Sequence, residues 1–378
     1  MRSLLWSCIL FISFGLLSGM SAINSTETNN YASVNLLPKD SIAARTDSII
    51  RKIAETNHCR VISKISRPGM PNFYSGYDGR KGENLTNFNG LIEIGSCTKM
   101  FTATSILQLV EKGKLSLQDK LVDVLPDITA YRALSTIDGK NYMDSVRIFN
   151  LLNHSSGFPD YFIDGNNDAE IALHGDSTLR FTYTQLLSLA QKTNKPYFIP
   201  GKGFKYSNTN YILLGMIIEK ITGMNYSQYI QQYILNPLQM KHTYFGSRNP
   251  PENAALGHYK GKRVVMPATL AGPAGDIISD LDDMQTFIRA WHNGILFSRS
   301  STMSVVKNEY YQPMSGNFIK YGLGVLNLLD LSLGHAGQTF GFQFYAGITS
   351  NGSSFVLSID DADVSIWDPA ATLSGLLQ

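Results

Sequence analysis

The sequence is poor in cysteine, in net charge and in long apolar runs. Of its 378 residues, three are Cys, and only Cys59 and Cys97 lie beyond residue 22, which is too few for a disulfide framework. Lys and Arg number 32 and Asp and Glu number 30, so the net charge of +2 provides no basic field for nucleic acid. Because 43% of the residues are hydrophobic and 16% are charged, a disordered chain is excluded and a large packed core is predicted.

The one long apolar run lies at the N-terminus, at residues 4–17, directly after Arg2. It is shorter than the ~20 residues that a membrane span needs, and small residues follow it at positions 18–22. This pattern predicts a signal peptide over residues 1–22, followed by a flexible polar N-terminus over residues 23–40. We therefore expect a periplasmic or secreted protein with no stable membrane span in the mature chain. An uncleaved N-terminal anchor is the alternative.

Export would place Cys59 and Cys97 in an oxidising compartment, where the two could pair. The sequence favours the other interpretation, in which Cys97 is a small buried apolar residue, because a single pair does not make a disulfide framework.

Strand-like patterns occur near both ends of the chain. Residues 60–65, 72–77 and 91–94 read as strands, and strand patterns return at residues 322–328, 331–334, 342–348 and 354–358. Between them, residues of about 96–270 read mostly as helices and loops. The expected fold is α+β, an α/β sandwich in which one antiparallel sheet is built from both chain ends and flanked by helices. A mostly helical subdomain is inserted into this single domain, which spans residues 41–378.

Ser96 and Lys99 are the first candidate catalytic pair, placed where a strand-like run meets a helical pattern. Three helical residues turn about 300°, so the two side chains lie within reach on one helix face. A neutral Lys99 could take the Ser96 proton, but an ordinary Lys pKa of ~10.4 leaves almost no neutral amine at neutral pH, so the fold must lower it. Ser304 and Lys307 share the same spacing and are interpreted as a chance surface pair.

Tyr206 and Asn208 form the second candidate group, in a loop before a helical segment. A phenol can pass protons to a leaving group, and a carboxamide can orient an amide substrate. The alternative is an ordinary turn stabilised by the Asn208 side chain.

His335, Gly337 and Gln338 form the third group, on a predicted strand. A glycine there lets a substrate backbone approach the strand, and the Gln338 N–H could donate to an oxyanion. Similar residues at His292 and Lys320 compete for this role, and a structural histidine is the alternative for His335.

The ordered set Ser-x-x-Lys, Tyr-x-Asn and His-x-Gly resembles the serine β-lactamase and penicillin-binding protein superfamily. The Tyr-x-Asn form is similar to the branch of class C β-lactamases and D-alanyl-D-alanine carboxypeptidases. Other stretches agree with this branch, and they are residues 153–159 (NHSSGFP), 236–240 (NPLQM), 271–276 (AGPAGD), 321–324 (YGLG) and 334–342 (GHAGQTFGF). The last stretch selects His335 over its two competitors.

The resemblance implies a role for each residue of the set. Ser96 would be the acylated nucleophile, Lys99 its general base and Tyr206 the proton shuttle. Asn208 would contact the substrate amide, and the backbone N–H groups of Ser96 and Gln338 would form the oxyanion hole. His154 is interpreted as structural. No His-Glu-x-x-His motif or Cys pair indicates a metal site, and no cofactor is expected.

His335 stands where class C β-lactamases carry Lys. This departure argues against β-lactamase activity and leaves serine acyl transfer intact. With an ordinary pKa of ~6.5, His335 would be partly protonated near neutral pH and could bind a substrate carboxylate.

The leading functional hypothesis is therefore an exported serine hydrolase that forms an acyl-enzyme. Its substrates would be small peptides, esters or β-lactams, including the peptidoglycan stem peptide, and the activity would be that of a D-alanyl-D-alanine carboxypeptidase-like peptidase or an esterase. The alternatives are a class C-like β-lactamase and a penicillin-binding sensor without turnover.

Overall fold

The computed structural model describes residues 39–162, 180–193, 195–246, 257–259, 262–264, 268–316 and 318–378. The predicted signal peptide, residues 1–22, and the polar segment as far as residue 38 lie outside the described residues. The described chain starts with helix α3 (Lys39–Asn57) and ends with helix α14 (Trp367–Leu377).

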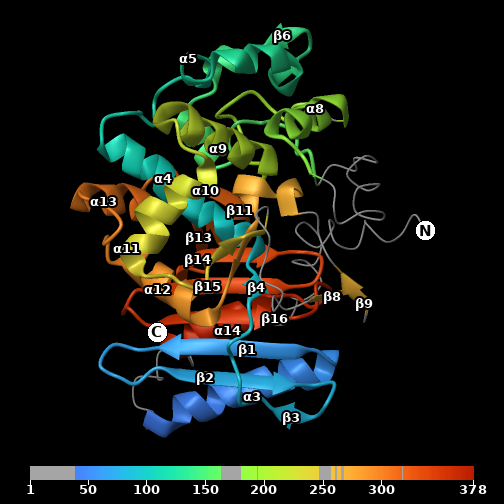
Figure 1. Cartoon of the computed structure of the whole chain (residues 1–378), viewed down its shortest axis with the longest axis vertical. Helices are drawn as coiled ribbons and strands as arrows, with labels where there is room; N and C mark the ends of the chain where they lie inside the picture. The colour runs from blue at the N-terminus through green and yellow to red at the C-terminus, as the bar shows by residue number, and fades with distance from the viewer. Residues whose placement is uncertain are drawn as a thin grey trace.

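The described strands build a nine-stranded antiparallel sheet from both ends of the chain, as the sequence predicts. Figure 1 shows the blue strands from the N-terminal part beside the red strands from the C-terminal part. The junction is the pair β1–β16, in which Val61 lies opposite Ile359. In sheet order the strands are β11 (Gln312–Ser315), β12 (Ile319–Tyr321), β13 (Leu326–Leu328), β14 (Ser332–Gln338), β15 (Gln343–Thr349), β16 (Ser354–Ile359), β1 (Arg60–Ser66), β2 (Phe73–Asp78) and β3 (Glu83–Asn84).

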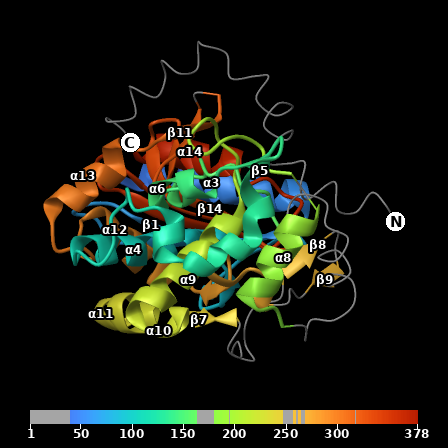
Figure 2. The ribbon, with the colours of Figure 1, turned by 90° about the horizontal axis from the view of Figure 1, so that it is seen from above.

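Helices cover both faces of this sheet, and the strands alternate their side chains between the two resulting cores. In β16, Val356 belongs to the core that includes the helical block, whereas Phe355 and Leu357 belong to the core beneath α3 and α14. Helix α12 (Leu281–His292) packs on the opposite face from α3. Figure 2 shows the two groups of helices on either side of the strands.

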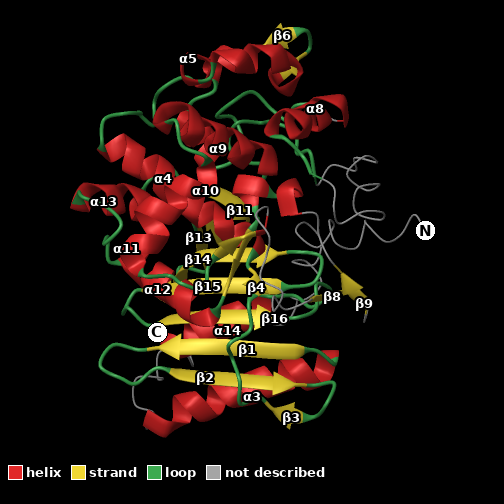
Figure 3. Ribbon diagram, viewed as in Figure 1, coloured by secondary structure: helices red, strands yellow, loops and turns green. Residues whose placement is uncertain are grey.

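The inserted segment is mostly helical, and most of it lies above the sheet in Figure 3, where it shares one core with the sheet. Its helices are α4 (Thr98–Glu111), α5 (Leu121–Val124), α6 (Ile148–Leu152), α8 (Tyr183–Thr193), α9 (Asn208–Thr222), α10 (Tyr226–Ile230) and α11 (Asn236–Leu238), and α13 (Ser300–Asn308) follows later. Short helical turns include η2 (Gly95–Cys97), η3 (Pro126–Ser135) and η5 (Gln231–Leu235).

Two strand predictions need correction. The run at residues 91–94 contributes β4 (Ile92–Glu93) to a separate three-stranded sheet with β10 (Ile277–Ser279) and β7 (Tyr244–Phe245). The predicted strand 322–328 is shortened to β13 because the chain turns at Gly324, whose φ is 76°. Two small ribbons complete the described strands, β5 (Thr136–Ile137) with β6 (Lys140–Asn141), and β8 (Gly257–Tyr259) with β9 (Lys262–Val264).

Helix α4 is the centre of the molecule, because almost all of its side chains are buried. A helix that is covered on every side must be packed by other elements around its whole circumference. Its N-terminal end, through η2, contacts β14. None of the helices in the described part of the chain is long and apolar enough to cross a membrane.

Candidate active site

Two glycines bring the backbone around Ser96 against strand β14. Gly95 has a φ of 51°, and a Cβ on it would lie 2.7 Å from the Gln338 carbonyl oxygen. A Cβ on Gly337 would lie 1.9 Å from the Ile94 carbonyl oxygen, which is far inside contact distance. Only glycine fits both positions, so these residues fix Ser96 beside the end of β14.

Lys99 lies one turn after Ser96 on α4 and is fully buried. Its Nζ donates hydrogen bonds to Ser96 Oγ at 2.9 Å, Asn208 Oδ1 at 2.8 Å and the Ala274 carbonyl oxygen at 2.7 Å. Burial lowers the pKa of Lys99 to about 7, although the nearby Asp160 carboxylate opposes the shift. Lys99 therefore gains and loses its proton near neutral pH, as the proposed role of a base for Ser96 requires.

The partners of Lys99 also determine where its lone pair points when it is neutral. An uncharged amine keeps two N–H groups, and Asn208 Oδ1 and the Ala274 carbonyl can only accept hydrogen bonds. The third direction, toward the Ser96 hydroxyl, is then left for the lone pair. This arrangement suits removal of a proton from Ser96 Oγ.

Tyr206 lies on the other side of Ser96. Its phenol shares a hydrogen bond with the Ser96 side chain, and its ring centroid is 4.9 Å from Lys99 Nζ. Burial raises the pKa of Tyr206 well above its ordinary value, so the phenol stays protonated at neutral pH. This arrangement would allow the Tyr206 phenol to pass a proton between Ser96 and Lys99.

Asn208 starts α9 and joins Lys99 to a carboxylate that the sequence analysis did not single out. Asp160 Oδ2 accepts from the Asn208 backbone N–H at 2.7 Å and from its Nδ2 at 3.0 Å. These bonds turn Asn208 Oδ1 toward Lys99 and leave one Nδ2 hydrogen available. Asp160 directly follows the predicted 153–159 loop, and nothing in its spacing marked it.

His335 lies in the same cluster but does not present a charge. Its Nδ1 lies 2.5 Å from the Ala336 carbonyl oxygen, so Nδ1 carries the proton and Nε2 accepts from the Tyr321 hydroxyl at 2.9 Å. Burial and the nearby Lys99 ammonium lower the pKa of His335 to about 3. The prediction that His335 is partly protonated near neutral pH is therefore wrong.

Gln338 directs its backbone N–H toward Ser96. The Thr339 N–H donates to the Phe342 carbonyl at 2.9 Å, and alternation along the antiparallel ladder then turns the Gln338 N–H away from β15. On that side lies the Ser96 segment, since a Cβ on Gly95 would be 2.9 Å from Gln338 N. The N–H groups of Ser96 and Gln338 thus border the same space, as an oxyanion hole requires.

Cys59 and Cys97 are both free and buried, so the alternative of a disulfide between them is wrong. The Cys97 Sγ lies 2.9 Å from the His335 carbonyl oxygen, and burial raises the pKa of its thiol. Cys97 is the small buried residue that the sequence favours.

The competing motifs lie elsewhere. Ser304 is exposed on α13, and Lys307 is one turn farther along the same helix. Lys320 pairs with Asp330 at 3.1 Å, and His292 ends α12. None of them lines the pocket that contains Ser96.

His154 holds the segment that carries Tyr206. Its backbone carbonyl accepts from the Lys205 N–H at 3.1 Å, and its Nδ1 accepts from the Ser207 N–H at 3.2 Å. The imidazole is fully buried, with its ring centroid 4.2 Å from that of Tyr206. His154 therefore holds Lys205 and Ser207, the two neighbours of Tyr206, and packs against the Tyr206 ring. This is the structural role that the sequence analysis predicts for it.

We expect the substitution His154→Ala to lower the free energy of unfolding by about 3 kcal/mol, because it leaves a cavity and strips the Ser207 N–H of its acceptor. Urea unfolding of the variant beside wild type measures this, with exposed Ser304→Ala as the control. A loss below about 1 kcal/mol would contradict the role of His154.

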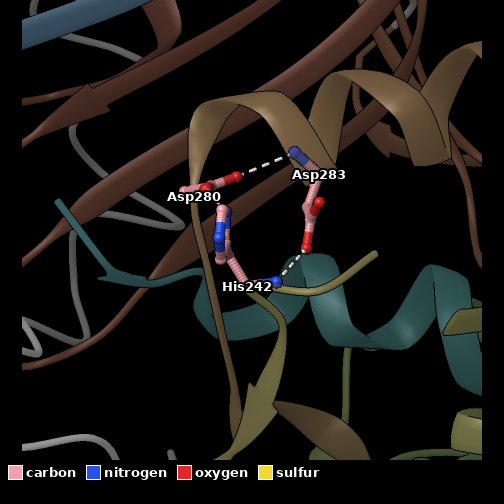
Figure 4. A group of neighbouring side chains, drawn as sticks. All are labelled: His242, Asp280 and Asp283. Atoms are coloured by element: carbon pink, nitrogen blue, oxygen red, sulfur yellow. Dashed lines mark hydrogen bonds and ion pairs between the residues drawn. The ribbon is translucent and has the colours of Figure 1, made fainter. Parts of the chain in front are cut away.

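Three side chains in the described residues lie close enough together to hold a metal ion, namely His242, Asp280 and Asp283 (Figure 4). Their polar atoms are engaged with one another: Asp280 Oδ1 accepts from the Asp283 N–H at 2.8 Å, and Asp283 Oδ2 accepts from the His242 N–H at 2.8 Å. The His242 Nδ1 lies 2.7 Å from Asp280 Oδ2. These contacts cap the N-terminus of α12, and the three residues do not line the Ser96 pocket.

Comparison with known proteins agrees with this geometry. A model of the Beta-lactamase family matches residues 61–361. Penicillin-binding protein 4* of Bacillus subtilis (strain 168) is 32% identical over 262 residues, which cover 62% of this chain and 52% of the relative. The chain thus spans about half the length of that relative.

Solved structures share the fold over almost the whole chain. The D-stereospecific amidohydrolase from Streptomyces sp. superposes with a TM-score of 0.73 and 27% identity, covering 86% of this chain and 97% of that chain. The D-amino acid amidase from Ochrobactrum anthropi SV3 gives a TM-score of 0.74 at 23% identity, covering 89% and 98%. The resemblance drawn from the sequence is confirmed: the protein belongs to the Beta-lactamase family.

Proposed function

We propose that the protein hydrolyses small peptides or esters through an acyl-enzyme on Ser96, as a D-alanyl-D-alanine carboxypeptidase-like peptidase or an esterase. The observation that carries the proposal is the 2.9 Å contact between Lys99 Nζ and Ser96 Oγ. Because burial lowers the pKa of Lys99 to about 7, a large fraction of this amine is neutral at neutral pH. A nucleophile and its base are then in contact without a further rearrangement.

In the acylation step, Ser96 Oγ attacks the substrate carbonyl carbon while its proton passes to Lys99 Nζ. The new C–O bond moves an electron pair onto the carbonyl oxygen, and the N–H groups of Ser96 and Gln338 stabilise the oxyanion. Asn208 holds Lys99 through its Oδ1, and its remaining Nδ2 hydrogen is available to a substrate amide.

Collapse of the tetrahedral intermediate expels the leaving group. Tyr206 donates its proton to the departing nitrogen or oxygen and regains one from the Lys99 ammonium, so that the scissile bond breaks without forming an anion in the pocket. A water molecule then attacks the acyl carbon, gives its proton to the same relay, and the acid product leaves as Ser96 Oγ recovers its hydrogen.

Mass spectrometry of the purified protein tests this proposal. The protein is exposed separately to benzylpenicillin, to a peptide ending in D-Ala-D-Ala and to a p-nitrophenyl ester, and is then quenched in acid and digested with trypsin. The acyl group is expected on the peptide of residues 82–99, which contains Ser96. Acylation of the peptide of residues 300–307, which contains Ser304, would contradict the assignment.

We also propose that the protein is exported, with residues 1–22 removed, and that it works in the periplasm or outside the cell. In the periplasm, the peptidoglycan stem peptide would be within its reach. N-terminal sequencing of the protein recovered from the cell envelope and from the medium tests this, since a mature start near residue 23 is expected. Recovery only from the cytoplasm with Met1 or Arg2 at the N-terminus would contradict export.

A further inference from the structure

The pocket around Ser96 has walls of apolar and aromatic side chains. Phe162 and Phe340 form one part of the lining, with ring centroids 5.9 Å apart. Met314, Ile366 and Trp367 supply apolar surface from β11 and the start of α14. Among the described residues that line the pocket, none is Asp, Glu, Lys or Arg.

Three polar side chains of the lining make hydrogen bonds within the protein. Gln338 Nε2 and Gln343 Nε2 both donate to the Ala362 carbonyl oxygen, at 3.3 Å and 2.9 Å. Thr339 Oγ1 accepts from the Phe342 N–H at 3.1 Å. Each glutamine thereby uses one of its two Nε2 hydrogens, and what these side chains can still offer a substrate is neutral.

His335 and Lys99, the two basic side chains near the nucleophile, are occupied as well. His335 uses both ring nitrogens, on Tyr321 and the Ala336 carbonyl, and its low pKa keeps it uncharged. Lys99 directs all three of its hydrogen bonds to Ser96, Asn208 and Ala274. Neither side chain offers a free charged donor to a substrate carboxylate.

We propose that this pocket selects esters and amides whose groups on both sides of the scissile carbonyl are uncharged and apolar, and that it discriminates against substrates that carry a carboxylate there. The inference rests on the proposed acyl-enzyme function and narrows it away from free-acid peptides and penicillins. A carboxylate that enters such walls loses its hydration without gaining a cation from the described lining, whereas an aryl or alkyl group gains by burial.

Benzylpenicillin and its methyl ester provide a matched pair, because they share the reactive ring and acyl group and differ in one charge. For each compound, the reaction is quenched in acid at set times and the rate of Ser96 acylation is measured by mass spectrometry. This rate is divided by the rate of alkaline hydrolysis of the same compound, which corrects for its intrinsic reactivity. We expect the ester to acylate about 100-fold faster than the free acid. Equal rates, or a faster reaction of the free acid, would overturn the inference.

A second pair separates this inference from the proposed function. The substrates p-nitrophenyl hexanoate and the half-ester p-nitrophenyl adipate carry acyl chains of equal length, and Ser96→Ala supplies the background rate. A kcat/KM ratio of about 100 in favour of the hexanoate is expected. A ratio near one, with turnover of both esters, would overturn the selectivity alone. Absence of acylation by all four compounds would overturn the acyl-enzyme function itself.

A positive charge placed on the apolar wall should reduce the preference for uncharged esters over free acids. Met314 is half-buried on the edge strand β11, where a longer polar side chain is tolerated. We expect Met314→Lys to narrow the difference between ester and free acid about tenfold relative to the uncharged control Met314→Gln. An identical ratio in the two variants would overturn the placement of this wall against the substrate.

Discussion

Replacing Lys99 by methionine is expected to lower kcat/KM for a neutral ester by at least about 10⁴-fold. The substitution removes the only amine in contact with Ser96 Oγ among the described residues, and with it the acceptor for the nucleophile's proton. The Tyr206 phenol cannot replace it, because burial holds the pKa of Tyr206 well above neutral pH. Stopped-flow acylation with a p-nitrophenyl ester measures the loss.

The variant is expected to remain folded. Burial opposes the ammonium form of Lys99, so a folding cost appears as the pH falls below the unfolded pKa of ~10.4, is complete below the folded pKa of about 7, and is relieved by methionine. This gain offsets the loss of hydrogen bonds to Asn208 and Ala274. Lys307→Met, at the chance Ser-x-x-Lys pair, is the matched control and should keep full activity. A Lys99→Met variant that is folded and retains more than about one-tenth of the activity would contradict the role of Lys99.

The pH profile of the wild-type enzyme gives the same prediction a second readout. Because the neutral amine is the active form, kcat/KM for a neutral ester should rise with pH and level off above the Lys99 pKa of about 7. The titratable groups that face Lys99 are Asp160, Cys97, His154, His335, Tyr206 and Tyr211. Burial holds the pKa of both histidines below this range and that of Cys97, Tyr206 and Tyr211 above it. A profile that is flat from about pH 6 to about pH 8 would contradict Lys99 as the base.

The strands of the sheet could be predicted because each one is marked by a short stretch of neighbouring residues. Strands such as β1 and β16 consist of short apolar runs bounded by turns, and strand patterns at both ends of one chain imply that the ends meet. The sequence does not define where a strand stops when glycine changes the chain direction. For that reason the run 322–328 was predicted as one strand, although Gly324 turns the chain there.

The sequence was enough to predict which residues form the candidate site. It was not enough to predict which of them carry a charge at neutral pH. The charge of His335 depends on its burial and on the nearby Lys99 ammonium. Its tautomer depends on a hydrogen bond with Tyr321, which lies two strands away in the sheet. Tyr321 occurs in a competing motif and in a stretch similar to the family, but the sequence indicates no contact with His335. Asp160 was missed for a similar reason, because its importance comes from its contacts with Asn208 and its field at Lys99.

The substitution Gly337→Ala is expected to lower the acylation rate about 10³-fold, since it forces apart the two backbone segments that carry the oxyanion donors. A methyl group at position 337 would lie 1.9 Å from the Ile94 carbonyl oxygen and 3.2 Å from Ser96 N. Ile94 cannot move away freely, because it is fully buried and its N–H donates to the Ile277 carbonyl at 3.1 Å. The strain must therefore appear as a displacement of the Ser96 segment relative to Gln338.

The displacement predicts two effects that can be separated by experiment. The free energy of unfolding should fall by about 2 kcal/mol, as overpacking of a buried contact does, while the rate of ester acylation should fall far more than this loss of folded protein explains. Gly90→Ala is the matched control, because a Cβ at Gly90 meets no atom within 4 Å and should leave both quantities unchanged. If Gly337→Ala were destabilised but acylated at the wild-type rate per folded molecule, the Gln338 N–H would not be an oxyanion donor, and the charge would have to be held by the Ser96 N–H and the N-terminus of α4.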